Sequence, residues 1–235
     1  MRAEVFIIAS LAGCGRIGFD PIVDVDQGLV GHWPFDEGTG TRTTDASGFA
    51  NDGLLTGGIE FAPGRIGMAV SLDGVDGHVN LEESSNVLDV GTRSFSYSVW
   101  VYPISAIGMY DCPWWRGGSS SFYPGYDFEL GTTPWHASLS DGTNIVLGTF
   151  GAEAADTWVL ITAVVDREAK RLFVYRDGAL VDQKQLAIGS LATTRTAIIG
   201  ATSNGATPFH GLIDDLRVYG RALDPEEVDA LYRVP

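Results

Sequence analysis

The chain has 235 residues, a formal net charge of −15 at pH 7 and a hydrophobic fraction of 45%. This acidic balance argues against a nucleic-acid-binding surface and against a polybasic membrane patch, since both need clustered Lys and Arg. It is compatible with divalent cations, whose preferred ligands are carboxylate oxygens.

At the N-terminus a short apolar run at 5–10 precedes the sequence LAGC at 11–14. The run is too short for a membrane-spanning helix, which needs about 20 residues, but it is typical of the apolar part of a cleaved signal peptide. LAGC resembles the lipobox of bacterial lipoproteins, and this resemblance implies cleavage before Cys14 and acylation of Cys14. Several acyl chains anchor stably, at about 0.8 kcal/mol per buried methylene. The alternatives are a small buried strand and an ill-chosen start codon.

We therefore expect a lipoprotein signal peptide over 1–13, a lipidated Cys and tether over 14–27, and one domain over 28–235. The expected location is the cell envelope, with the lipid anchor in the membrane. Because Gly15 rather than Asp follows the lipidated Cys, the general sorting pattern of Gram-negative lipoproteins favours the outer membrane. Acylation of Cys14 leaves Cys112 alone, so we expect the domain to fold without a disulfide.

From residue 29 onward, short runs of β-forming residues are separated by turns rich in Gly, Asp and Asn. Within 94–102, aromatic or β-branched residues alternate with serines, which is the period-two pattern of a half-buried strand. Only the C-terminus is typical of a helix, with Asp224 as N-cap and Pro225 at the first helical position. This pattern predicts an all-β, antiparallel β-sandwich with a short C-terminal helix. The predicted strands are 29–35, 68–74, 78–81, 94–102, 126–130, 135–139, 144–150, 157–166, 171–175, 179–187, 196–201 and 210–219.

Several segments together resemble the LamG-like jelly-roll domain of the concanavalin A-like lectin/glucanase superfamily. They include the opening strand and D-x-S-G-x-x-N-x-G turn within 28–55, the strand–DGVD–strand unit at 64–81, and the terminal strand and helix at 209–232. The resemblance covers about 28–233. It implies a concanavalin A-like jelly roll, and it implies a structural calcium ion, which members of this superfamily often hold.

A candidate calcium site follows from the strand at 212–219. Regular alternation would place Asp214 on the same face as Leu216 and Val218, where an ionised carboxylate is costly unless it is paired or bound to a metal. The first and last strands of a jelly roll commonly pair, so the turn that carries Asp45 and Asn51 can approach. We predict a structural Ca²⁺ bound by Asp45, Asn51 and Asp214. The alternative is that Asp45 and Asn51 cap the turn by Asx hydrogen bonds while Asp214 pairs with Arg217 or Arg65.

A second candidate site is a run of aromatic side chains in a Gly/Ser-rich stretch. Flat aromatic faces can stack on sugar rings, and apolar pockets with a few polar groups are the usual binding sites. The alternative is that these rings pack the stretch onto the sheet. The predicted ligand-binding residues are Trp114, Trp115, Arg116, Tyr123, Tyr126 and Trp135.

Catalysis is not expected. A retaining glycosidase needs two carboxyl groups about 5–5.5 Å apart, and Asp127 and Glu129 are the only acids two residues apart on a convincing strand. The third acid that the hydrolases of the superfamily carry is missing, because position 131 is Gly. The four histidines are scattered without zinc-ligand spacing.

We therefore predict a non-catalytic domain that recognises a glycan or an envelope or extracellular protein, carried on a lipid-anchored envelope protein and stabilised by calcium. One alternative from another class is a structural or interaction module that binds no glycan. A less favoured alternative is a divergent glycoside hydrolase.

Overall fold

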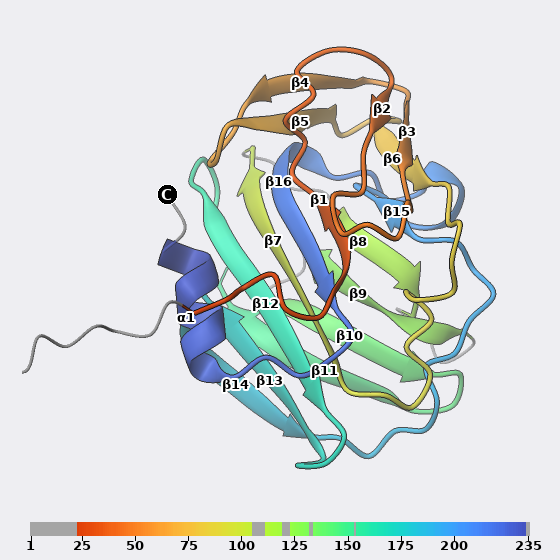
Figure 1. Cartoon of the computed structure of the whole chain (residues 1–235), viewed down its shortest axis with the longest axis vertical. Helices are drawn as coiled ribbons and strands as arrows, with labels where there is room; N and C mark the ends of the chain where they lie inside the picture. The colour runs from red at the N-terminus through yellow and green to blue at the C-terminus, as the bar shows by residue number, and fades with distance from the viewer. Residues whose placement is uncertain (1–22, 105–110, 119–122, 132–133, 153, 234–235) are drawn as a thin grey trace, which may run out of the picture.

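The computed structural model describes residues 23–104, 111–118, 123–131, 134–152 and 154–233. Two antiparallel sheets pack face to face, and the one α-helix in the described residues lies against one of them (Figure 1). The predicted all-β jelly-roll sandwich with a short C-terminal helix is confirmed. Cys14 and the predicted signal peptide lie outside the described residues.

The first sheet has the strand order β14-β13-β12-β7-β16-β5-β4, and β1 also pairs with β16. The first and last strands of the fold are therefore neighbours, with His32 opposite Arg217. Its strands are β1 (Leu29–Trp33), β4 (Ile59–Pro63), β5 (Met68–Asp73), β7 (Phe95–Pro103), β12 (Val159–Asp166), β13 (Arg171–Arg176), β14 (Ala179–Gln185) and β16 (His210–Tyr219).

The second sheet has the order β11-β10-β9-β8-β15-β6-β3-β2. Short strands of two to four residues form one end of this sheet, and β8 to β11 have seven residues each. Its strands are β2 (Arg42–Thr43), β3 (Gly53–Thr56), β6 (His78–Leu81), β8 (Asp111–Gly117), β9 (Pro124–Leu130), β10 (Trp135–Asp141), β11 (Ile145–Gly151) and β15 (Ile198–Ile199).

The core lies between the two sheets and is rich in aromatic side chains. In β7 the alternation works as predicted, because Phe95 and Tyr97 point into this core while Ser98 lies on the other face and hydrogen-bonds Thr162 of β12. Tyr97 from the first sheet stacks on Phe128 from the second, with ring centroids 4.3 Å apart. Such aromatic pairs stabilise a core beyond the area that they bury.

The helix α1 (Pro225–Arg233) covers the outer face of the first sheet. Its N-terminus has the predicted cap, because the Asp224 carboxylate accepts the N–H groups of Glu226 and Glu227, both at 2.9 Å. The Glu227 carboxylate in turn accepts the Asp224 N–H at 2.8 Å, which completes a capping box. Val228 and Leu231 are buried against the sheet.

The segment before β1 packs on the same face as the helix. Val25 contacts the cluster that α1 covers, and Asp26 forms an ion pair with Arg217 at 3.3 Å. The guanidinium of Arg221, just after β16, donates to the carbonyl of Gln27 at 2.9 Å. The two ends of the described chain are therefore joined on the outer face of the first sheet.

A β-bulge in β16 changes the face on which Asp214 lies. The pairing with β7 shifts between Asp214 and Arg217, and Asp215 has a positive φ of 46°. Ile213, Leu216 and Val218 all point into the core between the sheets, whereas Asp214 does not. The prediction that Asp214 shares the apolar face of Leu216 and Val218 is therefore wrong, because regular alternation does not continue through a bulge.

Asp214 is fully buried where β16 meets the loop before β5. Its Oδ2 accepts the N–H groups of Arg65 and Ile66, both at 2.8 Å, while Oδ1 has no hydrogen-bond partner among the described residues. Gly64 permits this close approach, since a Cβ there would lie 2.6 Å from Oδ2. Burial, opposed by these two N–H groups and reinforced by the charge of Asp215, raises the pKa of Asp214 from 3.8 to about 7.

Replacing Asp214 with Asn tests whether the pKa of Asp214 is raised, because the pH dependence of stability should then change. Because the pKa is higher in the folded state than in the unfolded chain, the wild type should lose stability as pH rises from about 4 to above 7. Asp214→Asn keeps a carbonyl to accept the two N–H groups but cannot ionise. We expect it to exceed the wild type by about 2–4 kcal/mol in free energy of unfolding at pH 8 and to match it near pH 4.

The measurement is urea unfolding of both proteins from pH 4 to 8, with EDTA and separately with CaCl₂. A stability difference that does not vary with pH would contradict the assignment. If calcium neutralised Asp214, CaCl₂ would stabilise the wild type at pH 8 and leave Asp214→Asn unchanged.

A second prediction follows from the hydrogen bonds that Asp224 accepts at the N-terminus of α1. Asp224→Ala removes the acceptor for two N–H groups at the helix N-terminus and should lower the free energy of unfolding by about 1 kcal/mol. The matched control is Asp229→Ala in the same helix, whose carboxylate forms only an exposed ion pair with Arg233. That change should cost at most about 0.5 kcal/mol. Equal effects of the two substitutions in thermal unfolding would contradict the capping role.

Candidate functional site

The structure separates the predicted aromatic residues into two groups. Trp114, Tyr126 and Trp135 lie on β8, β9 and β10, have 0% exposure and point into the core between the sheets. The ring centroid of Trp114 lies 5.8 Å from that of Trp33 and 6.0 Å from that of Tyr126. The prediction that these three rings contact a ligand is therefore wrong, since all three are committed to the core. For these three residues the alternative interpretation holds, because their rings pack this part of the chain into the core.

Trp115 lies on the other face of β8, which is the outer face of the second sheet. In the strand register, Ile198 of β15 stands opposite Trp115 of β8 on one side and opposite Asn80 of β6 on the other. Asn80, Ile198 and Trp115 therefore form a row across three adjacent strands. Together with Arg195, Thr196 and Ser203 they line a surface hollow of about 280 Å³.

A second hollow of about 430 Å³ adjoins the first, because Arg195 lines both. Its other lining residues are Tyr123, Pro124, Ala192, Thr193 and Thr194. The guanidinium carbon of Arg195 lies 3.9 Å from the ring centroid of Tyr123 and 5.7 Å from that of Trp115. We call the two hollows together, from Asn80 to Thr194 around Arg195, the arginine groove.

Two of the predicted aromatic residues thus reach the groove. Tyr123 is 49% exposed and carries the Arg195 guanidinium over its ring, whereas Trp115 is 6% exposed and forms part of the floor. Beneath this floor Trp115 packs in a small cluster with Cys112, Ile198 and Ala201. Burial raises the pKa of the Cys112 thiol well above its ordinary value, with the charges of Asp127 and Glu129 acting in the same direction.

Arg116 has a structural role instead of the predicted role as a ligand donor. Its side chain is buried and forms an ion pair with Glu83, whose carboxylate also accepts the N–H of Ala197 at 2.7 Å. These contacts tie β8 to the chain just after β6 and to the chain just before β15. Arg116 therefore holds the strands that carry Asn80, Ile198 and Trp115 together.

Sequence reasoning missed Arg195, Asn80 and Ser203 as groove residues. Asn80 could have been found, because in the strand HVNL it alternates with Val79 and Leu81 and so belongs on the outer face. Arg195 could not, since it comes before a strand of two residues and its place over Tyr123 depends on how distant parts of the chain meet.

The acid pair of β9 lies on the same outer face, but it is buried. Asp127 stands opposite Trp115 and has 0% exposure, and Glu129 is 7% exposed. Glu129 Oε2 lies 2.6 Å from His136 Nε2 on β10. Burial opposes protonation of His136, but the hydrogen bond to Glu129, the contact with the Pro134 carbonyl and the charge of Glu129 raise its pKa above 6.5. Glu129 is thus hydrogen-bonded to the His136 imidazole.

Of the predicted calcium ligands, Asp45 and Asn51 are in contact, whereas Asp214 is bound by a different turn. The Asp45 carboxylate accepts the N–H groups of His32, Ser47 and Asn51 at 2.9–3.0 Å, as well as the Asn51 side-chain amide at 3.3 Å. A carboxylate surrounded by N–H donors is already satisfied and does not fit a cation. Asp214 is bound by the turn at 65–66 instead. The described residues also contain no group of three or more His, Cys, Asp or Glu side chains placed to hold a metal ion.

This arrangement around Asp45 is the turn-capping alternative. The predicted ligand set Asp45, Asn51 and Asp214 therefore does not form one site. That this chain binds calcium stays a prediction.

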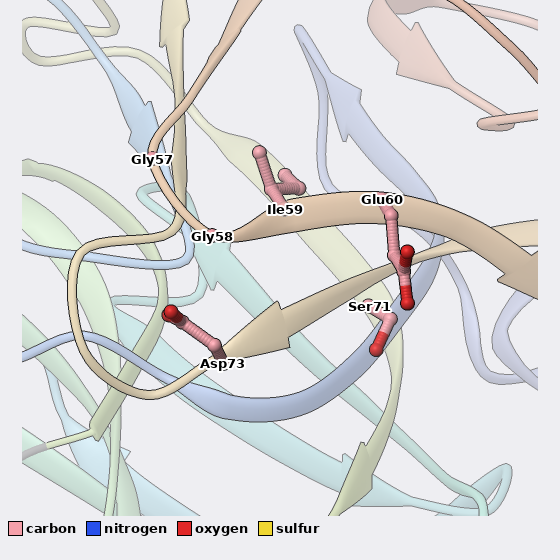
Figure 2. A pocket seen from close by; sticks show the side chains of 6 residues that line it. All are labelled: Gly57, Gly58, Ile59, Glu60, Ser71 and Asp73. Carbon is pink, nitrogen blue, oxygen red and sulfur yellow. The ribbon is translucent and has the colours of Figure 1, made fainter.

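Another hollow, of about 330 Å³, lies beside the hairpin of β4 and β5 (Figure 2). Glu60 and Ser71 stand opposite each other on the two strands, and Figure 2 shows their side chains close together. Asp73 Oδ1 accepts the N–H groups of Val75, Asp76 and Gly77, which lowers its pKa. This hollow is acidic and offers no aromatic face, so it is a poorer candidate than the arginine groove.

Among the described residues, no helix is sufficiently long and apolar to span a bilayer.

Comparisons with solved structures identify domains of the same fold. Domain 4 of AbnA, a GH43 extracellular arabinanase from Geobacillus stearothermophilus solved with arabinotriose, matches with a TM-score of 0.67 and 25% identity, covering 87% of this chain and 98% of that domain. The binding domain of Paraclostridial Mosquitocidal Protein 1 matches with a TM-score of 0.74 and 16% identity, covering 88% of this chain and 52% of that one.

The binding domain of botulinum neurotoxin DC, solved with rat synaptotagmin II and with SialylT, matches with a TM-score of 0.68, identities of 15% and 16%, and the same coverages of 88% and 52%. This chain thus spans about half the length of the toxin binding domains that it matches. No curated protein sequence matches it significantly.

A family model matches residues 73–229, which is more than half of the chain, and it describes the fold observed in the structure. The strands that line the arginine groove, from β6 to β15, lie within this match. The chain belongs to the concanavalin A-like lectin/glucanases superfamily.

Proposed function

We propose that this chain is a non-catalytic carbohydrate-recognition domain and that its ligand lies in the arginine groove. The observation that carries the proposal is the row formed by Asn80, Ile198 and Trp115 on one outer sheet face, with the exposed ring of Tyr123 beside it. An aromatic ring offers a flat apolar surface to a sugar, and the amide and hydroxyl groups around it can bond the sugar hydroxyls.

The similar structures support a binding domain. AbnA domain 4, which is similar to almost the whole of the described chain, was solved with arabinotriose, and the neurotoxin DC domain was solved with SialylT. The same neurotoxin domain was also solved with a protein, synaptotagmin II, which supports a protein partner as the second candidate. The arrangement of β9 supports a non-catalytic role, because Glu129 is engaged by His136.

Anchoring at the cell envelope through acylated Cys14 is part of the proposal. It is supported only by the sequence, since Cys14 lies outside the described residues. The described domain would then follow a tether and carry the groove on the far side from its first strand.

A glycan array probed with the full chain tests the proposal. We expect binding to at least one oligosaccharide and an affinity about tenfold lower, equal to about 1.4 kcal/mol, for Tyr123→Ala and for Trp115→Ala. Tyr123→Ala is the safer variant, because that ring is half exposed and its removal leaves the core intact. The matched control is Tyr232→Ala, which removes a 38% exposed ring from α1 on the opposite side of the sandwich.

A flat array, or equal binding by Tyr123→Ala, Trp115→Ala and the wild type, would contradict glycan recognition at this groove and favour the protein-binding candidate. Hydrolysis of a bound oligosaccharide that disappears in Glu129→Gln would contradict the non-catalytic role.

A further inference from the structure

Arg195 lies in the arginine groove without a carboxylate partner among the described residues. Among the described residues, five arginines form ion pairs with carboxylates, and six form none, of which Arg195 lines both hollows of the groove. The guanidinium of Arg195 donates a hydrogen bond to no described residue, although Arg195 is half-buried and lines two hollows of an acidic protein. The five paired residues are Arg42, Arg116, Arg217, Arg221 and Arg233.

The two rings hold this cation without using its donors. A guanidinium that stacks on an aromatic face is attracted through its plane, so that the N–H groups on its edge remain available. Arg195 lies 3.9 Å from the Tyr123 centroid and 5.7 Å from the Trp115 centroid. Both rings therefore fix the position of the charge and leave its donors for a group in the groove.

The backbone beside Arg195 is also held in place. Thr193 Oγ1 accepts the N–H of Arg195 at 3.3 Å, and the N–H of Thr193 donates to Asp89 Oδ1 at 3.3 Å. The N–H of Ala197 is bound by Glu83, whose charge is already compensated by Arg116. Glu83 is thus paired with Arg116, and among the described residues Arg195 forms no ion pair with a carboxylate.

The ligand group that matches such a site is a carboxylate. A planar guanidinium bonds a carboxylate through two parallel N–H···O contacts, and these charge-assisted bonds are roughly twice as strong as neutral ones. A neutral sugar would leave the cation without a partner. The amide of Asn80 and the hydroxyl groups of Thr196 and Ser203 can serve the neutral hydroxyls of the same ligand.

We infer that the arginine groove recognises an acidic glycan, in which a sugar carboxylate is bound by the guanidinium of Arg195. This inference rests on the proposed function and specifies its ligand class. Two sources share the chemistry, namely uronic acids of a polysaccharide and terminal sialic acids.

The experiment is calorimetry of the full chain with matched probes that differ in the carboxylate. One arm compares tetragalacturonate with its methyl ester, and the other compares sialyllactose with lactose. We expect one of the acidic probes to bind at least tenfold more tightly than its neutral counterpart, and added NaCl to weaken that binding.

The variant Arg195→Gln should remove this preference, so that acidic and neutral probes bind alike, and Arg195→Lys should restore part of it. The matched control Arg233→Gln removes a distant, exposed arginine of α1 and should leave the preference intact. Because the Arg195 side chain forms no ion pair or hydrogen bond with a described residue, Arg195→Gln loses only its contacts with the two rings and should lower the melting temperature little.

The outcomes separate the two proposals. Binding of neutral glycans that depends on Tyr123 but shows no preference for acidic probes and no effect of Arg195→Gln overturns the inference and leaves glycan recognition standing. Equal losses for Arg195→Gln and Arg233→Gln also overturn it, because the effect would then be one of net charge. No binding to any glycan overturns both.

Discussion

The structure depends on the aromatic contact between its two sheets. Phe95 and Tyr97 of β7 meet Tyr126 of β9 with ring centroids 4.7 and 5.1 Å apart, and Trp33 extends the contact to Trp114. The described residues contain no disulfide, so this packing closes the sandwich. It also determines the outer face, because neighbouring residues in a strand point to opposite sides. With Trp114 directed inward, Trp115 must lie outside, where it forms the floor of the groove.

Much of the fold could be predicted from the sequence, because it depends on local patterns. The alternation in β7, the two-sided apolar character of β12 and the capping signals at Asp224 each indicate one structure, and each was found. The strands at 42–43, 53–56, 59–63 and 111–117 were missed. The first three are short or irregular in pattern, and the last carries Trp114 and Trp115 side by side, which suggested a binding loop.

The candidate site was predicted only in part, since its parts depend on tertiary structure. Aromatic composition indicated Trp115 and Tyr123, but it could not separate them from Trp114 and Tyr126, which differ only in the face to which they point. The bulge at Asp215 reversed the side on which Asp214 lies, and an Asp inside a strand-like run does not by itself predict a bulge. Arg195 acquires its role from two rings that lie in other parts of the chain.

The position of Val25 and Asp26 against the helix-covered face has a consequence for how this domain meets its surroundings. These two residues lie on the outer face of the first sheet, whereas Trp115, Ile198 and Asn80 of the groove lie on the outer face of the second sheet, so that both layers stand between them. If the domain is attached through the segment before Val25, as we propose, the arginine groove faces away from that attachment and stays accessible to a ligand.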